Sequence, residues 1–190
     1  PYREKYDKLI ISPGAEPIRP PLDGIGLDTI FSLRNIPDVD RIKAYVDEKQ
    51  PKDAVVVGGG FIGLEVAESL VHRGVKVTVV EMLDQIMPPI DFEMAAIAQQ
   101  HLRAKGVDLI LGDGVKSFSQ KDGRTTVATS GGRELVCDLV VLSIGVKPEN
   151  KLAKDAGLAL GERGGIKTND RMLTSDPDIY AVGDAIEITD

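Results

Sequence analysis

Three glycines at the spacing G-x-G-x-x-G occur in the stretch DAVVVGGGFIG, residues 53–63. Gly58 allows a tight turn, Gly60 lets a pyrophosphate approach the backbone, and Gly63 lets a helix pack closely on a strand. The N-terminus of a helix that follows such a turn offers free N–H groups and a partial positive charge to phosphates. A glycine-rich turn can also be purely structural, so the motif has weight only between a strand and a helix. In that setting it predicts a dinucleotide site, with Phe61 and Ile62 in the same turn.

Glu81 stands 18 residues beyond Gly63, at the end of the next expected strand. A carboxylate at this place accepts hydrogen bonds from the adenosine ribose hydroxyls and repels a 2′-phosphate. The residues that follow, MLDQIM, contain no arginine or lysine that could receive such a phosphate. We therefore expect NAD(H) rather than NADP(H) as the cofactor. The alternative for Glu81 is a solvated glutamate at a strand end.

The elements that must position these residues alternate between strand and helix. Residues 54–57 form a short apolar run, and apolar residues then recur at helical spacing from Leu64 to Val71 until Gly74 stops the helix. Residues 75–80 read as the next strand. Together they predict a β-α-β unit with parallel strands and a right-handed crossover.

A second helix-strand unit follows, and after it the periodicity of the apolar residues changes. Asp91 is expected to cap a helix over residues 92–105 that ends at Gly106, and residues 107–111 return as a strand. The segments VKSFSQ, TTVATS and RELV, joined by KDG and GG, have the turn chemistry of a β-meander. Residues 139–144 are apolar except at position 143, and they predict a strand buried on both faces. The fold class is α/β: a Rossmann-like nucleotide-binding domain with a three-stranded β-meander.

Composition limits the function further. The chain has 190 residues, of which 42% are hydrophobic and 28% charged, as in ordinary globular proteins. Its net charge of -7 argues against nucleic acid or an anionic membrane as partner. Its apolar runs are shorter than the roughly 18 residues of a membrane span. A single cysteine fits a reducing compartment, so we expect a cytoplasmic protein. Because the chain starts at Pro1, we expect it to be cut from something longer.

Four stretches carry a resemblance to a known family: VVVGGGFIGLEVAESLVHRGVKVTVVE, DFEMAAIAQQHLRAKGVDLILGDGV, DLVVLSIGVKPEN and TSDPDIYAVGDA. In this order they resemble the FAD-dependent pyridine nucleotide-disulfide oxidoreductases, above all the branch of coenzyme A-disulfide reductases, NADH oxidases and persulfide reductases. The resemblance implies NAD(H) and FAD as cofactors, a thiol, disulfide, persulfide or oxygen as acceptor, and a homodimeric parent enzyme. The family's first FAD fingerprint, its redox cysteine and its dimerisation domain have no counterpart in these 190 residues.

The resemblance also assigns single residues. SIGVKPEN resembles the family's A-T-G-x-R-P-N motif and places Gly145 near the NAD, although Ser143, Ile144 and Lys147 depart from its commonest residues. IISPG places Gly14 on the flavin side. In YAVGDA, Asp184 would accept from the FAD ribityl chain, with Gly183 and Ala185 beside it. A strand ending in Gly-Asp can equally be a structural turn.

Glu65 resembles the family's glutamate near the nicotinamide. The alternative is an acid that is favoured in a first helical turn by the helix dipole alone.

Several other reactive side chains are set aside. Tyr45 and Lys49 form Y-x-x-x-K, but they precede the nucleotide strand in what reads as a surface helix. Cys137 has no neighbouring histidine or second cysteine and reads as a core thiol. His72 and His101 fall on separate helices without ligand partners at metal spacing, so we expect no metal site.

The resulting hypothesis is an NAD-binding domain over residues 30–148, flanked by segments of an FAD-binding domain at 1–22 and 150–190. The domain lays NADH against the flavin for hydride transfer, and no catalytic residue is expected within the chain. Two alternatives stay open. One is a free-standing NAD-binding or regulatory module without catalysis, and the other is a flavin-free dehydrogenase that uses Tyr45 or Cys137.

Overall fold

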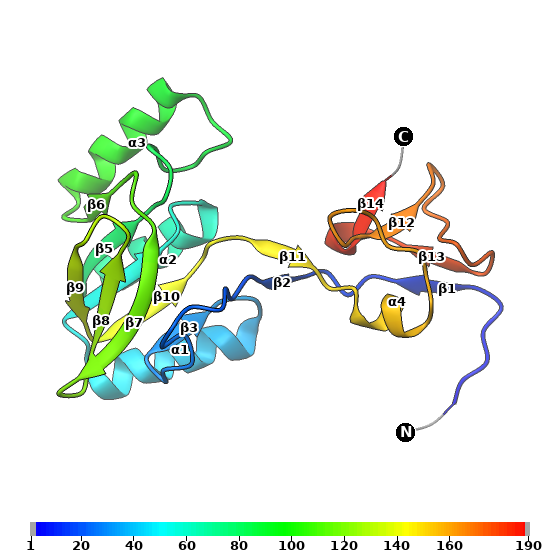
Figure 1. Ribbon diagram of the computed structural model, residues 1–190, viewed down its shortest axis with the longest axis horizontal. Helices are drawn as coiled ribbons and strands as arrows, with labels where there is room; N and C mark the ends of the chain where they lie inside the picture. Colours follow the sequence, from blue (N-terminus) through cyan, green and yellow to red (C-terminus); the bar gives the residue numbers. More distant parts are fainter. Residues whose placement is uncertain (1–2, 189–190) are drawn as a thin grey trace. The chain divides into compact units, whose positions relative to one another are not determined.

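The computed structural model describes residues 3–188 and divides into two compact units (Figure 1). One unit comprises residues 17–145. The other is built from the two flanking stretches, up to residue 16 and from residue 146 onward. Each unit has its own buried apolar core, so each is described by itself.

The larger unit is organised around a five-stranded parallel sheet of order β3-β10-β4-β5-β6. Its strands are β3 (Ile30–Ser32), β4 (Asp53–Val57), β5 (Lys76–Val80), β6 (Asp108–Ile110) and β10 (Leu139–Leu142). The central strands consist almost wholly of valine, alanine and leucine, and their residues are buried on both faces of the sheet. The predicted apolar strands are thus confirmed.

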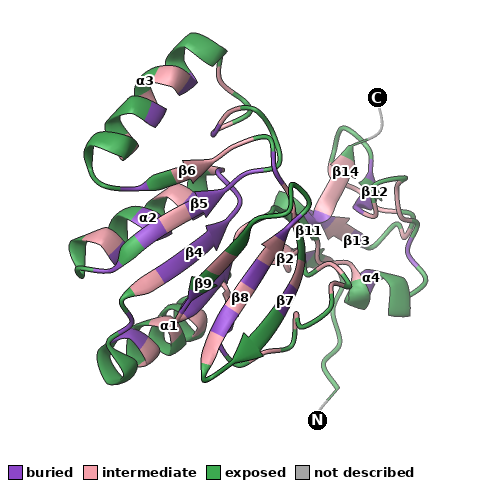
Figure 2. Ribbon diagram, turned by 60° about the vertical axis from the view of Figure 1, so that its left-hand side comes forward, coloured by how far each residue is buried: buried purple, intermediate pink, exposed green. Residues whose placement is uncertain are grey.

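Three helices cover one face of this sheet. They are α1 (Ile36–Lys49), α2 (Phe61–His72) and α3 (Phe92–Ala104). Val46 of α1 and Leu70 of α2 pack against Val56, Val77 and other strand residues of the same face, and Leu102 of α3 reaches the same cluster. Figure 2 colours much of β4 and β5 as buried. Within the described residues no helix is both long and apolar enough to cross a membrane.

Helix starts differ in detail from the expectations. α1 begins with a capping box, in which Asn35 accepts from the N–H of Asp38 and the Asp38 side chain accepts from the N–H of Asn35. α2 begins directly at Phe61, three residues earlier than the first apolar residue of the periodic pattern. Asp91 stands at the N-cap of α3 as predicted, but its side chain makes no capping hydrogen bond. The expected side-chain cap is therefore wrong.

The predicted β-meander is confirmed and lies on the other face of the sheet. It consists of β7 (Val115–Lys121), β8 (Arg124–Thr129) and β9 (Glu134–Cys137), paired antiparallel in that order. Phe118 and Val127 pack against Val55 and Val140 of the parallel sheet. The turn between β7 and β8 has left-handed backbone at Asp122 and Gly123, as the KDG sequence requires.

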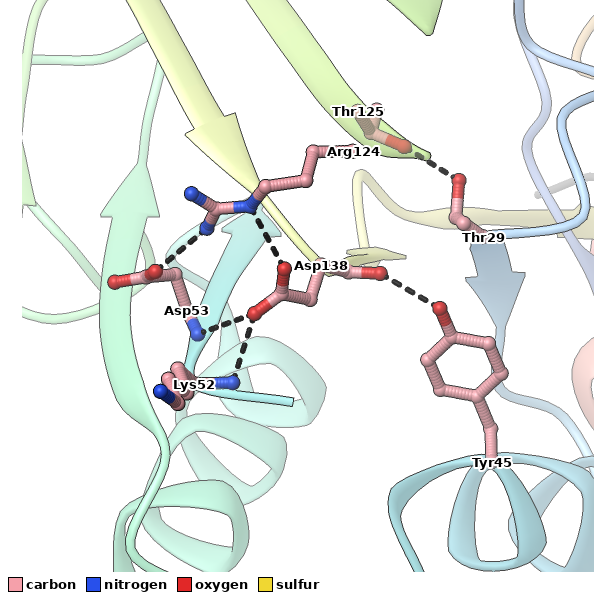
Figure 3. Close-up of polar contacts among 7 residues, drawn as sticks. All are labelled: Thr29, Tyr45, Lys52, Asp53, Arg124, Thr125 and Asp138. Carbon is pink, nitrogen blue, oxygen red and sulfur yellow. Dashed lines mark hydrogen bonds and ion pairs between the residues drawn. The ribbon is translucent and has the colours of Figure 1, made fainter. Parts of the chain in front are cut away.

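A polar network fastens this meander to the amino ends of two parallel strands (Figure 3). Arg124 of β8 donates to the carboxylate of Asp53 at 2.6 Å and to that of Asp138 at 2.8 Å. The second oxygen of Asp138 accepts from the backbone N–H groups of Lys52 and Asp53 at 2.8 and 3.0 Å. Burial alone would raise the pKa of Asp138, but these hydrogen bonds outweigh it and lower the pKa below the ordinary range.

The smaller unit contains β1 (Leu9–Ile11) paired in parallel with β13 (Ile179–Ala181), and β12 (Ile166–Thr168) paired in parallel with β14 (Ile186–Ile188). α4 (Lys151–Asp155) and the short 3₁₀ helix η1 (Gly183–Ala185) complete it, with the strands β2 (Ala15–Pro17) and β11 (Val146–Pro148) at its junctions with the larger unit. Its core includes Ile11, Leu158, Ile166 and Ala181.

Candidate functional site

The carboxyl ends of three parallel strands bring the predicted NAD residues together. In the sheet, Val57 of β4 is in register with Val80 of β5 on one side and with Leu142 of β10 on the other. The residues that follow these strands begin with Gly58, Glu81 and Ser143 and therefore meet at one edge. In parallel α/β sheets, ligands bind at this end of the strands.

The glycines of the turn are of two kinds. A Cβ on Gly58 would lie 2.3 Å from the carbonyl oxygen of Ser143, and the φ of +109° is unfavourable for other residues. A Cβ on Gly63 would lie 2.0 Å from the carbonyl oxygen of Gly58 and 2.6 Å from Ser143 Oγ. A Cβ on Gly60, by contrast, would meet no atom within 4 Å. Gly58 and Gly63 thus close the turn, while Gly60 borders open space at the N-terminus of α2. Helix N-termini of this kind bind phosphate groups in other proteins.

Three other predicted residues lie on the exposed side of α2. The side chains of Phe61 and Ile62 are 61% and 41% exposed, and Glu65 is exposed one turn further along the helix. None of them packs into the core of the larger unit. Their exposure leaves them accessible to a ligand bound at the helix N-terminus.

Glu81 is a buried residue with only 9% exposure, so it is not a solvated strand-end glutamate. One carboxylate oxygen accepts from the backbone N–H of Gly59 at 2.7 Å, and the other accepts from the N–H of Leu83 at 2.9 Å. Each carboxylate oxygen can accept a second hydrogen bond. The carboxylate is therefore held in one place beside the glycine turn with capacity left for hydroxyl donors.

Ser143 contributes to the turn in a way that the sequence analysis missed. Its hydroxyl lies 3.0 Å from the carbonyl oxygen of Val57 and 3.2 Å from that of Gly58, to which it can donate. β10 ends at Leu142 and not at Ile144, and the backbone N–H of Ser143 also donates to the carbonyl oxygen of Val57 at 2.8 Å, so both the backbone and the side chain of Ser143 bind the end of β4. A hydroxyl directly after an all-apolar strand was the available signal.

Gly145 follows two residues later at the same edge. Its φ of +112° is in the region that favours glycine, and its carbonyl oxygen accepts from the N–H of Ile18 at 3.0 Å. The residue itself is exposed. The structure therefore places Gly58–Gly63, Glu81 and Gly145 within one unit and around one sheet edge.

The residues expected on the flavin side lie together in the smaller unit. Ile11 of β1 is in register with Ala181 of β13, and the N–H of Val182 donates to the carbonyl oxygen of Ile11 at 3.1 Å. Gly14 and Gly183 follow these two strands, both with positive φ. Asp184 is exposed in η1, whereas Ala185 is fully buried.

Tyr45, Lys49 and Cys137, which the sequence analysis set aside, have environments typical of structural residues. The Tyr45 hydroxyl donates to the carbonyl oxygen of Asp138 at 2.8 Å, and burial raises its pKa, while Lys49 pairs with Glu48. Cys137 is 1% exposed, and burial raises the pKa of its thiol to about 12. The prediction of a core thiol is confirmed. His72 and His101 are exposed on α2 and α3.

Comparison with known proteins gives a consistent result. The model of the pyridine nucleotide-disulphide oxidoreductase family matches residues 2–189. An NADH oxidase of Methanocaldococcus jannaschii is 40% identical over 190 residues, which is the whole of this chain and 42% of that protein.

Two solved structures have the same fold. Reduced CoADR-RHD of Bacillus anthracis superposes with a TM-score of 0.93 at 53% identity, over 97% of this chain and 33% of that one. The water-forming NADH oxidase of Lactobacillus brevis, bound to NADH, superposes with a TM-score of 0.86 at 34% identity, over 96% of this chain and 40% of that one. The chain thus spans less than half the length of each of these relatives.

Proposed function

The chain belongs to the pyridine nucleotide-disulphide oxidoreductase family, and from that premise we propose that residues 30–148 bind NAD(H) and position it for hydride transfer to FAD. The flanking residues, 1–22 and 150–190, form part of the FAD-binding domain. In the longer, homodimeric enzyme the electrons pass on to a thiol, disulfide, persulfide or oxygen acceptor. The enzyme acts in a reducing compartment, the cytoplasm, which suits the single free cysteine.

The observation that carries this proposal is the convergence of the glycine turn, Glu81 and Gly145 at one sheet edge. The open space at Gly60 suits a pyrophosphate at the N-terminus of α2. The bound NADH of the Lactobacillus brevis relative, which shares this fold, supports the same cofactor here. When bound, the two cofactors supply the redox chemistry, and the protein contributes binding and orientation.

Glu81 sets the preference for NADH over NADPH. Its carboxylate is fixed by two backbone N–H groups and faces the place of the adenosine ribose. A 2′-phosphate would meet this buried negative charge, and residues 82–87 offer no cation to compensate. The ribose hydroxyls of NADH donate to the carboxylate instead.

On the flavin side, the exposed carboxylate of Asp184 accepts hydrogen bonds from the ribityl hydroxyls, with Gly183 and the buried Ala185 beside it in η1 and Gly14 on the same side. These residues supply one wall of a flavin site. The 190 residues contain no second G-x-G-x-x-G turn to hold the FAD pyrophosphate. Because charge-assisted hydrogen bonds contribute about 1.5–3 kcal/mol each, the loss of that wall prevents tight FAD binding by this chain alone.

The test uses the chain of residues 1–190 as purified protein. NADH is titrated by calorimetry, the visible spectrum is recorded for bound flavin, and NADH oxidation is assayed with oxygen and with a disulfide. We expect NADH binding, no flavin absorbance and no turnover. The Gly60→Val variant, whose added side chain enters the phosphate space, is the matched control and should not bind NADH.

Failure of the unaltered chain to bind NADH contradicts the proposal. A yellow protein that oxidises NADH would show instead that these residues form a complete enzyme. Flavin absorbance in the longer protein distinguishes the proposal from a regulatory NAD-binding module and from a flavin-free dehydrogenase. The second of these is also disfavoured by the burial and high pKa of Cys137.

A further inference from the structure

Gly59 is not one of the three glycines of the nucleotide fingerprint, yet it is buried within the turn. Its N–H donates to Glu81 at 2.7 Å, and its carbonyl oxygen accepts from the N–H of Met87 at 2.8 Å. A Cβ at this position would lie 3.0 Å from the Cγ2 atom of Ile86. Gly59 is therefore fixed by contacts with the residues that follow β5.

This segment, residues 82–90, is itself fixed by a series of internal contacts. The side-chain amide of Gln85 donates to the carbonyl oxygen of Ile90 at 2.9 Å. The N–H of Ile90 donates to the carbonyl oxygen of Met87 at 3.0 Å. Met87 has a left-handed backbone with φ of +49°. Ile86 is fully buried, so its backbone N–H is withdrawn from water and needs a partner within the protein.

Gln99 of α3 supplies that partner. Its Oε1 atom accepts from the N–H of Ile86 at 3.2 Å, and the residue is only 6% exposed. The same helix buries Ala95 and leaves larger apolar residues such as Ile97 in solvent. A buried glutamine beside alanine on this inward face adds little apolar packing. Its contribution to residues 82–90 is therefore the hydrogen bond that its amide oxygen accepts from Ile86.

We infer that Gln99 is a positioning residue for the adenosine-ribose end of the nucleotide. Through the N–H of Ile86 it holds the segment 82–90 against Gly59, and Gly59 in turn donates to the carboxylate of Glu81. A residue of α3 thereby fixes the orientation of a carboxylate that it does not touch. This inference rests on the proposed NAD(H) function of the site.

Four variants of the full 190-residue chain test it, with calorimetric dissociation constants for NADH and for NADPH. Gln99→Leu keeps the apolar volume and removes the acceptor, whereas Gln99→Glu keeps an acceptor oxygen in either protonation state. Ile86→Ala shortens the side chain that lies on Gly59. Gln100→Leu changes the exposed neighbour of Gln99 on the same helix and is the control.

We expect Gln99→Leu and Ile86→Ala to reduce the preference for NADH over NADPH by about threefold to tenfold, as the loss of one buried hydrogen bond or contact implies. Gln99→Glu should restore the preference, and Gln100→Leu should leave it unchanged. If Gln99→Leu fails to fold, Ile86→Ala decides the question. This ratio separates positioning from simple stabilisation, because a loss of stability alone lowers the melting temperature without changing cofactor choice.

An unchanged NADH preference in Gln99→Leu, or in Ile86→Ala, overturns the inference and leaves the proposed function standing. Absence of NADH binding by the unaltered chain overturns both. The two failures are therefore distinguishable in the same set of titrations.

Discussion

Replacement of Gly63 by valine should destabilise the larger unit. The first added atom alone would lie 2.0 Å from the carbonyl oxygen of Gly58 and 2.6 Å from Ser143 Oγ, so the backbone of the turn must move. Overpacking of this kind costs about 1–3 kcal/mol. Displacement of Ser143 adds about 0.5–1.5 kcal/mol, because its single hydroxyl proton is shared between the carbonyl oxygens of Val57 and Gly58.

The sum, about 1.5–4.5 kcal/mol, corresponds to a fall in melting temperature of about 3–18 °C for a chain of this size. Thermal unfolding followed by circular dichroism measures it. Gly60→Val is the matched variant: its φ of -80° and ψ of -177° suit valine, and its Cβ would meet no atom within 4 Å. We expect its stability to stay within about 0.5 kcal/mol of the unaltered chain while NADH binding is lost. A larger fall in melting temperature for Gly60→Val than for Gly63→Val would refute this reasoning.

Three further predictions concern other parts of the larger unit. Glu81→Ala should remove an NADH preference of about 1–3 kcal/mol, measured by calorimetry with both nucleotides, and equal affinities in the unaltered chain would reject the role of Glu81. Asp138→Asn should lower stability at neutral pH by about 1–3 kcal/mol without changing NADH affinity, because its network lies at the amino ends of the strands. Since the pKa of Asp138 is lowered in the fold, its contribution is present at neutral pH and is lost as the pH falls below about 4, so denaturation curves of the two proteins should converge in acid. Cys137, with its pKa raised to about 12, should resist alkylation by iodoacetamide at pH 8 until denaturant is added, and rapid reaction of the folded protein would contradict its burial.

Much of the larger unit could be predicted because its signals are local. The apolar run before Gly58, the helical spacing after Gly63 and the turn residues of the meander each determine structure over a few neighbouring residues. The candidate NAD residues were predicted from equally local signals, because the three glycines and Glu81 all belong to a single β-α-β unit. The pattern was sufficient to predict that these residues lie at the carboxyl ends of neighbouring parallel strands.

What could not be predicted depends on contacts between distant segments. Ser143 lies 85 residues from Gly58 in the chain, and nothing local to it indicates that β10 runs beside β4. The hydrogen bond of Gln99 could not be predicted either, because its partner is a backbone N–H in a segment without regular structure. The failed cap at Asp91 has the opposite cause: the residue type and position were right, but the side chain does not make the bond.

The position of β10 in the sheet has a consequence for how the protein is made. β10 is contributed by residues 139–142, yet it lies between β3 and β4, and in the described part of the chain β3 has no other neighbour in the sheet. During translation from the N-terminus, β3 must wait for more than 100 residues before its partner exists. Until then one edge of β4 is bare, and unpaired edges favour aggregation. Because the loop entropy of such long-range pairing is lost before its contacts form, we expect this unit to fold slowly and late. We therefore expect a nascent chain stalled within the meander to bind chaperones more than one that already includes the whole larger unit, up to Gly145.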